Sequence, residues 1–151
     1  KHSDSHIEPE KTPMLKELEE TLWLSAMKKG GFKEAVIRII LSVTSANHII
    51  NMAEYDAAKE IMKSDDRLKA VTPDELKNLI REQSALLEKD REQALETLIN
   101  LLWLKKDRKA AMKIARSLTD IEAIKKFKKT ALLKKIESIL LKDDPEFVYS
   151  S

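Results

Sequence analysis

Apolar residues recur along this chain at intervals of three and four, the spacing of amphipathic α-helices. The pattern is densest between residues 32 and 45, where apolar positions cover most of the circumference of a helix. Those positions are Phe32, Ala35, Val36, Ile37, Ile39, Ile40, Leu41 and Val43. A helix that is apolar on so many sides has to be enclosed by other elements. We therefore predict that residues 32–45 form a central, buried helix.

Weaker stripes predict further helices on both sides of the central one. The first begins at Thr12-Pro13 and uses Leu15, Leu18 and Leu22 as its apolar stripe. The others are expected at 51–62, from 72 to at least Leu87, at 90–104 and 107–118, and from a break near 119–127 to about 141. A turn is expected at 64–66. These segments would surround the central helix.

Several residues are typical helix boundaries. Thr12 and Thr72 each precede a proline, which suits a capping threonine followed by the first helical position. Glu75 stands three residues after Thr72 and predicts a capping box. Gly30 and Gly31 predict the end of the first helix, because glycine accepts the left-handed conformation found there.

The chain partly matches itself at an offset of 75 residues. Residues 35–39 align with 110–114, residues 42–44 with 117–119, and residues 59–61 with 134–136. Each copy is predicted to be a helix, a loop and a second helix. Two copies are too few for a solenoid. The repeat instead favours a compact bundle built from two related helix pairs.

Composition agrees with an all-α fold. Only 2 glycines and 4 prolines occur in 151 residues, so the turn residues that β-hairpins need are scarce. The length suits one domain. We predict a compact bundle of about six to eight helices over residues 12–142. Residues 1–11 are expected to be a polar tail or linker, and residues 143–151 a C-terminal tail.

The chain contains no cysteine, which excludes thiol chemistry and predicts a reducing, cytoplasmic location. No apolar stretch is long enough and sufficiently free of charge to predict a transmembrane segment. Nothing at the N-terminal end resembles a signal peptide. The polar start, from Lys1 to Lys11, is typical of a fragment edge or a linker.

Charge is spread unevenly although the net value is only +2. Residues 105–142 contain 13 basic and 4 acidic groups, a local net charge of +9. Nucleic-acid binding is not expected, because around Lys125–Lys135 only Phe127 is interleaved and no arginine is present. A solvated face or an acidic protein partner explains the lysines better.

Two tryptophans and five lysines form the candidate interaction surface. The tryptophans lie beside leucines and are expected in the core or a groove, with an exposed partner anchor as the alternative. The lysines belong to the basic segment. The full set is Trp23, Trp103, Lys125, Lys128, Lys129, Lys134 and Lys135.

The sequence offers no catalytic constellation, so we predict that this segment is not an enzyme and holds no cofactor or metal. It has no nucleophile elbow, no phosphate-binding glycine loop and no zinc motif. Of its 3 histidines, His2 and His6 lie in the tail, while His48 is expected to complement a helix C-terminus. Arg81 and Glu82 are expected to form a buried or half-buried ion pair.

Three stretches carry a family resemblance, namely 30–35 (GGFKEA), 79–83 (LIREQ) and 107–111 (DRKAA). The chain resembles the tellurite-resistance TerB-like helical fold. More specifically, it resembles the C-terminal region of an uncharacterised bacterial family whose upstream α/β-hydrolase domain is similar to polyhydroxyalkanoate synthases. The resemblance covers roughly residues 15–141 and implies a TerB-like bundle. It does not transfer a metal site, because the loop 44–51 contains no carboxylate and the second loop offers only Asp120 and Glu122.

These observations favour one function and leave two alternatives open. The first is a non-catalytic accessory module that docks the hydrolase-like domain in cis, associates with itself, or recruits that domain to a polymer or membrane surface. The second, implied by the TerB resemblance, is a cation-binding stress-response protein. The third is nucleic-acid binding through the basic C-terminal helix.

Overall fold

The computed structural model describes residues 12–44, 52–119 and 130–141, and every regular element in these ranges is a helix. The predicted all-α bundle of about six to eight helices is confirmed. The helices are α1 Pro13–Met27, α2 Phe32–Thr44, α3 Met52–Met62, α4 Asp66–Lys69, α5 Pro73–Lys89, α6 Arg91–Glu96, α7 Leu98–Leu101, α8 Lys105–Thr119 and α10 Thr130–Leu141.

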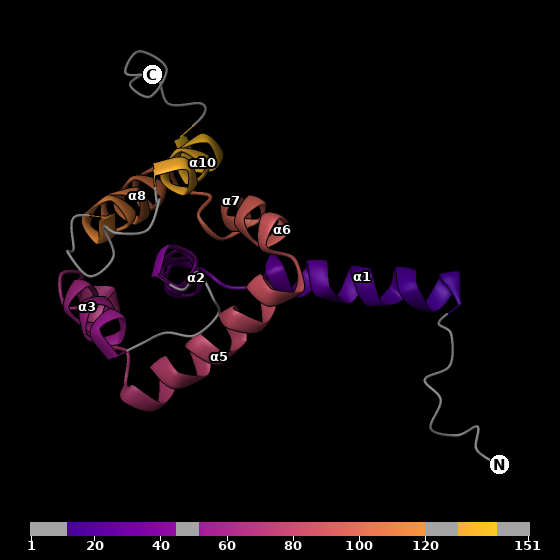
Figure 1. Ribbon diagram of the computed structural model, residues 1–151, viewed down its shortest axis with the longest axis horizontal. Coiled ribbons are helices and arrows are strands. Elements are labelled where there is room, and N and C mark those ends of the chain that lie inside the picture. Colours follow the sequence, from indigo (N-terminus) through magenta and orange to yellow (C-terminus); the bar gives the residue numbers. More distant parts are fainter. Residues whose placement is uncertain (1–11, 45–51, 120–129, 142–151) are drawn as a thin grey trace.

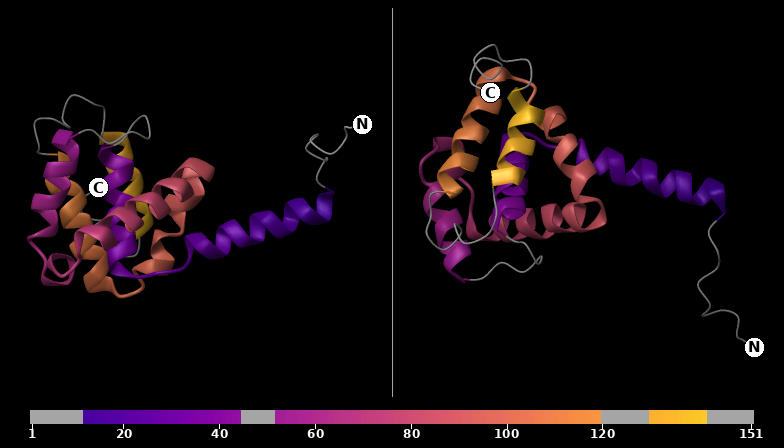
Figure 2. Two further views of the ribbon diagram at one scale, coloured as in Figure 1. Left: turned by 90° about the horizontal axis from the view of Figure 1, so that it is seen from below. Right: turned by 45° about the horizontal axis from the view of Figure 1, so that its top comes forward.

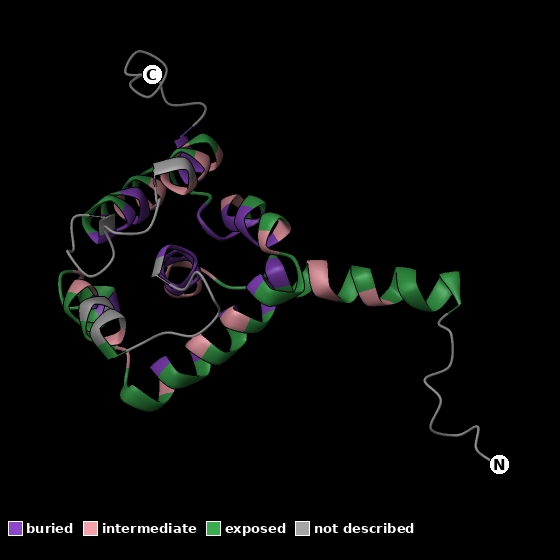
Figure 3. Ribbon diagram, viewed as in Figure 1, coloured by how far each residue is buried: buried purple, intermediate pink, exposed green. Residues whose placement is uncertain are grey.

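Helix α2 lies at the centre of the bundle, as its sequence predicted. Figure 1 shows it end-on, with α3, α5, α6, α7, α8 and α10 arranged around it. It packs most extensively against α5 and α8. Its residues from Ala35 to Val43 are all buried (Figure 3). Burial on every side follows from the apolar pattern, because exposing any of its apolar side chains to water would cost free energy.

The predicted helix starts at Thr12 and Thr72 are confirmed. The Leu15 backbone N–H donates to Thr12 Oγ1 at 3.2 Å, and the Glu75 N–H donates to Thr72 Oγ1 at 3.1 Å. A backbone hydrogen bond from Thr72 is among the causes that lower the pKa of Glu75, as the predicted capping box requires. The same carboxylate accepts a hydrogen bond from Lys33 Nζ at 2.6 Å, so Glu75 also links α5 to α2.

The connection from α1 to α2 depends on Gly30. Its φ of 120° lies in the region that favours glycine, and an added Cβ would lie 2.7 Å from the Glu34 side chain. That side chain is already engaged, since Glu34 Oε1 accepts the Gly31 N–H at 2.8 Å. The end of the first helix is near the predicted glycines. The contact between Glu34 and Gly31 caps the start of the next helix, α2.

The helix predicted at 90–104 is interrupted. It consists of α6 and α7, which meet at Thr97, and it ends at Leu102. Thr97 Oγ1 donates to the carbonyls of Gln93 and Ala94, and such contacts compete with regular helical geometry. The turn expected at 64–66 leads into the short helix α4, whose start is capped by Asp65.

The two halves of the repeat adopt different environments. The corresponding helices α2 and α8 pack against each other, but α3 and α10 both pack on α8. Arg38 of α2 is fully buried, whereas Lys113, its counterpart in α8, is exposed. The loops that join each pair lie outside the described residues.

Helix α1 projects away from the rest of the bundle (Figures 1 and 2). Its C-terminal half contacts α5 and α6 and contributes the buried Met27. Lys89 of α5 joins it there, with Nζ 3.5 Å from Glu20 Oε1 and 5.8 Å from the centre of the Trp23 ring. Within the described ranges, no helix is long and apolar enough to cross a membrane.

Candidate interaction surfaces

The two predicted tryptophans have opposite environments. Trp23 is half-buried and packs against the core where α1 joins the body. Trp103 lies between α7 and α8 with 76% of its surface exposed, and the adjacent Leu104 is also exposed. The expected core or groove position therefore holds for Trp23 and is wrong for Trp103. Leu102, the residue before Trp103, takes the buried position instead.

The predicted lysine surface is only partly described. Lys125, Lys128 and Lys129 lie outside the described residues. Lys134 is exposed on α10, whereas Lys135 is half-buried, with Nζ 3.8 Å from Glu92 Oε1 of α6. Lys135 therefore links two helices of the bundle. His2, His6 and His48 also lie outside the described residues.

The ion pair expected for Arg81 and Glu82 is not formed as predicted. Both residues are exposed on α5, and Arg81 Nη1 donates to Asn78 Oδ1 of the same helix at 3.4 Å. The buried polar residue of this stretch is the next one, Gln83. The helical register turns Gln83 towards α2 and leaves its two neighbours in solvent.

Gln83 belongs to a buried polar cluster centred on Arg38. The Arg38 Nε–H donates to Gln83 Oε1 at 2.8 Å. Its Nη1 donates to the Ala94 carbonyl at 2.9 Å and to Thr97 Oγ1 at 3.2 Å, while Nη2 has no hydrogen-bond partner among the described residues. Desolvation lowers the pKa of Arg38 to about 10, against the raising effect of Glu34. The guanidinium therefore remains charged at neutral pH among neutral acceptors.

This cluster was not among the sites predicted from the sequence, although a signal was present. Arg38 is the one charged residue between Ala35 and Val43 of a helix predicted to be buried on all sides. A cation in that position has to find acceptors on the surrounding helices. The cluster joins α2 to α5, to α6 and to Thr97 at the start of α7. Its role is therefore to hold these helices together.

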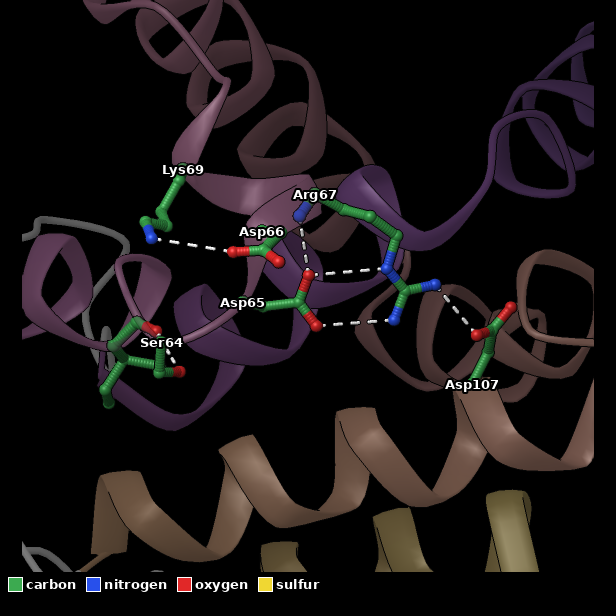
Figure 4. Close-up of polar contacts among 7 residues, drawn as sticks. Ser64, Asp65, Asp66, Arg67, Lys69 and Asp107 are labelled. Atoms are coloured by element: carbon green, nitrogen blue, oxygen red, sulfur yellow. Dashed lines mark hydrogen bonds and ion pairs between the residues drawn. The ribbon is translucent and has the colours of Figure 1, made fainter.

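A second polar cluster joins α4 to α8 at the surface. Arg67 lies between Asp65 and Asp107 (Figure 4), with Nη1 donating to Asp107 Oδ1 at 2.8 Å. Its guanidinium also covers the Phe32 ring, 3.6 Å from the ring centre. Hydrogen bonds to Asp107 and then Asp65 raise the pKa of Arg67. Burial acts to raise the pKa of Asp65, but the hydrogen bonds from Arg67 outweigh it and lower that pKa.

The stretches that carry the family resemblance lie in these two clusters. Phe32 belongs to the first stretch, Gln83 to the second and Asp107 to the third. Each contacts an arginine on a helix other than its own. Phe32 and Asp107 contact Arg67 of α4, and Gln83 contacts Arg38 of α2. These stretches therefore have clear packing roles.

An exposed apolar stripe on α1 is the most unusual surface feature. Leu15, Leu18 and Leu22 were expected to pack inwards, but 52%, 55% and 61% of their surfaces are exposed. Met14 adjoins them and is 76% exposed. The expectation is wrong because α1 packs through its other face, which carries Trp23, Leu24 and Met27.

Acidic residues border the stripe on both sides. At about 100° per residue, Glu17 and Glu19 fall roughly 40–60° beyond its two edges. Glu20 points instead towards the body, where it meets Lys89. The projecting part of α1 is therefore an acidic amphipathic helix. We refer to Met14, Leu15, Leu18 and Leu22 as the α1 stripe.

Two grooves lie on the side of the bundle away from the projecting helix α1. The first, of about 630 Å³, lies between α3 and α8, and Glu60, Asp65 and Lys113 are among its polar residues. The second, of about 170 Å³, lies among α3, α4 and α5. Its apolar residues are Tyr55, Met62, Leu68, Val71, Pro73 and Leu76, and its charged residues are Lys59, Lys63 and Lys69. We call the second the lysine groove.

The described residues contain no group of three histidine or acidic side chains arranged to hold a metal ion. No protein-family model matches the chain, and no curated protein or solved structure shows significant similarity to it.

Proposed function

We propose that this chain is a non-catalytic interaction module and that α1 is its docking element. The observation that carries the proposal is the α1 stripe, four large apolar side chains exposed on one face of a projecting helix. Contiguous exposed apolar surface, bordered by polar residues, is typical of protein interaction sites. An amphipathic helix that lays such a stripe into a groove is a common way for proteins to associate.

The occupant we propose is a second copy of the chain. Self-association is one of the three modes of interaction expected from the sequence, and it needs no component other than the protein itself. It gives a direct test by sedimentation velocity over a range of concentrations. We expect the sedimentation coefficient to rise with concentration.

A matched pair of variants makes this test specific to α1. Leu18→Gln removes the central residue of the stripe, whereas Lys16→Gln changes an exposed residue on the opposite side of α1. We expect Leu18→Gln to abolish the concentration dependence and Lys16→Gln to retain it, with unchanged helicity in both. A wild-type protein that sediments as a monomer at every concentration would reject the proposal.

The family resemblance supplies a further proposal, in which the module accompanies a hydrolase-like domain similar to polyhydroxyalkanoate synthases. The gene of origin tests it, since a full-length product without such a domain upstream of Lys1 removes this part. The α1 proposal is independent of that result.

A further inference from the structure

The α1 stripe and the lysine groove are complementary in shape and charge. The stripe is an apolar ridge with Glu17 and Glu19 beyond its edges. The groove has an apolar floor and three lysines, Lys59, Lys63 and Lys69, among its lining residues. We propose that the α1 stripe of one copy docks in the lysine groove of a second copy. This inference rests on the proposed function and names the surface that receives α1.

The size of the groove suits side-chain anchors of a helix. Its volume of about 170 Å³ is close to that of a cavity of about 150 Å³ that accepts benzene. A leucine side chain is of that order, so the groove accepts one stripe residue while the others cover its edge. Leu18, at the middle of the stripe, is the residue best placed to enter.

The lysines are available to a partner because their present contacts are exposed and weak. Lys63 pairs with Glu60 and Lys69 with Asp66, both within three residues and with highly exposed side chains. Lys59 lies over the Tyr55 ring, 5.4 Å from its centre. Exposed pairs of this kind contribute little stability. Replacing the present acidic partner of a lysine by a glutamate of another molecule therefore costs little free energy.

The groove of the same molecule is out of reach of its own α1. Lys89, near the end of α5, contacts α1, whereas Pro73 and Leu76, at the start of α5, line the groove. The 17 residues of α5 separate these places by about 25 Å, and α1 projects in the opposite direction (Figure 1). The occupant is therefore the α1 of another copy.

Two competing arrangements are less favourable. Pairing of two α1 stripes brings the bordering glutamates of both helices together, and like charges repel. The groove between α3 and α8 has Glu60 and Asp65 among its lining residues, which repel an acidic helix. The lysine groove offers opposite charge instead, and such complementarity selects one partner surface over others.

Helix α1 and the lysine groove lie at opposite ends of the molecule, so docking of one into the other gives head-to-tail association. One copy inserts α1 into the next and leaves its own groove free, so the contact repeats until a ring closes or a chain grows. The arrangement therefore predicts species beyond the dimer as concentration rises.

Disulfide trapping in the full-length chain tests the contact, since the protein has no native cysteine. Leu18→Cys and Val71→Cys are made as separate proteins and mixed under mild oxidation. We expect the mixed disulfide dimer to exceed both homodimers. A predominance of Leu18→Cys homodimers, or equal amounts of all three, would overturn the inference.

Charge exchange provides the second measurement. Lys59→Glu with Lys63→Glu should weaken association roughly tenfold, and adding Glu17→Lys and Glu19→Lys should restore most of it. Lys113→Glu, in the other groove, is the matched control and should have no effect. If the wild type associates but the groove variants and the control behave alike, the groove is wrong and the α1 proposal survives. If the wild type does not associate, the proposed function itself fails.

Discussion

The Nε–H of Arg38 donates to Oε1 of Gln83 at 2.8 Å and thereby links the central helix to α5 inside the core. Arg38 is fully buried, and its other bonded acceptors are a carbonyl and a hydroxyl. A buried cation held only by neutral groups depends on every one of them. The stability of the bundle should therefore be sensitive to Gln83.

Gln83→Leu should lower the free energy of unfolding by about 1–3 kcal/mol, because it leaves the Arg38 Nε–H buried without an acceptor. The double variant Arg38→Met/Gln83→Leu should recover much of that loss, since it removes both partners together. Urea unfolding of the four proteins in the cycle measures the coupling. Glu82→Gln, one residue away and exposed, is the control. Equal midpoints for Gln83→Leu and Glu82→Gln would contradict the assignment.

The contact between Lys33 and Glu75 predicts a pH dependence. The hydrogen bond to Lys33 lowers the pKa of Glu75 from 4.5 despite opposing desolvation, and the bond to Glu75 raises the pKa of Lys33 from 10.5. The contribution of Glu75 is present above its unfolded pKa and is lost as pH falls through the lower folded value. That of Lys33 is present below 10.5 and is lost as pH rises through the higher folded value.

Glu75→Gln should therefore be less stable than the wild type at pH 7, and the difference should shrink at both extremes of pH. Urea midpoints measured across the pH range check this expectation. Glu88→Gln, which removes an exposed carboxylate from the same helix, serves as the reference. A difference between wild type and Glu75→Gln that is constant with pH would exclude the contact in solution.

The planar guanidinium of Arg67 should contribute to stability beyond its charge alone. Arg67→Lys keeps the positive charge but loses the planar group that covers Phe32 and bonds to both Asp65 and Asp107. The side chain is 47% exposed, so the expected loss is about 0.5–1 kcal/mol. Lys69→Ala, which removes a more exposed pair, should be close to neutral. Chemical unfolding that ranks the two variants in the opposite order would count against this role.

The two tryptophans should respond differently to substitution. Trp23→Ala removes packing between α1 and the body and should cost about 1–2 kcal/mol, less than full burial because the residue is only half-buried. Trp103→Ala should stay within about 0.5 kcal/mol, as expected for an exposed residue. Acrylamide quenching of single-tryptophan variants provides an independent check. Quenching of Trp23 as strong as that of Trp103 would mean that α1 does not pack as described.

Local signals predicted much of the fold. Thr12 and Thr72 cap the helices they precede, Gly30 has the left-handed conformation, and the apolar run after Phe32 forms the central helix. These features are encoded within a few residues of each position. They depend on backbone conformation and helical spacing, which a single sequence displays directly.

The surface was harder to predict because it depends on contacts between distant residues. Leu18 and Trp23 are both large apolar residues of the same helix, yet only Trp23 packs against the body. Periodicity identifies an apolar stripe but not what covers it. Likewise, Arg38 is visible as a lone charge in the sequence, but its partners Gln83 and Thr97 come from elsewhere in the chain.

Hydrogen–deuterium exchange at several protein concentrations tests the docking role of α1 most directly. Backbone amides of residues 14–22 should exchange rapidly in dilute solution and become protected as concentration rises, because α1 becomes covered only by a second molecule. Segments 59–63 and 69–76 of the lysine groove should gain protection over the same range, while Leu18→Gln should show neither change. Exchange in residues 14–22 that is independent of concentration in the wild type would contradict the docking role of α1.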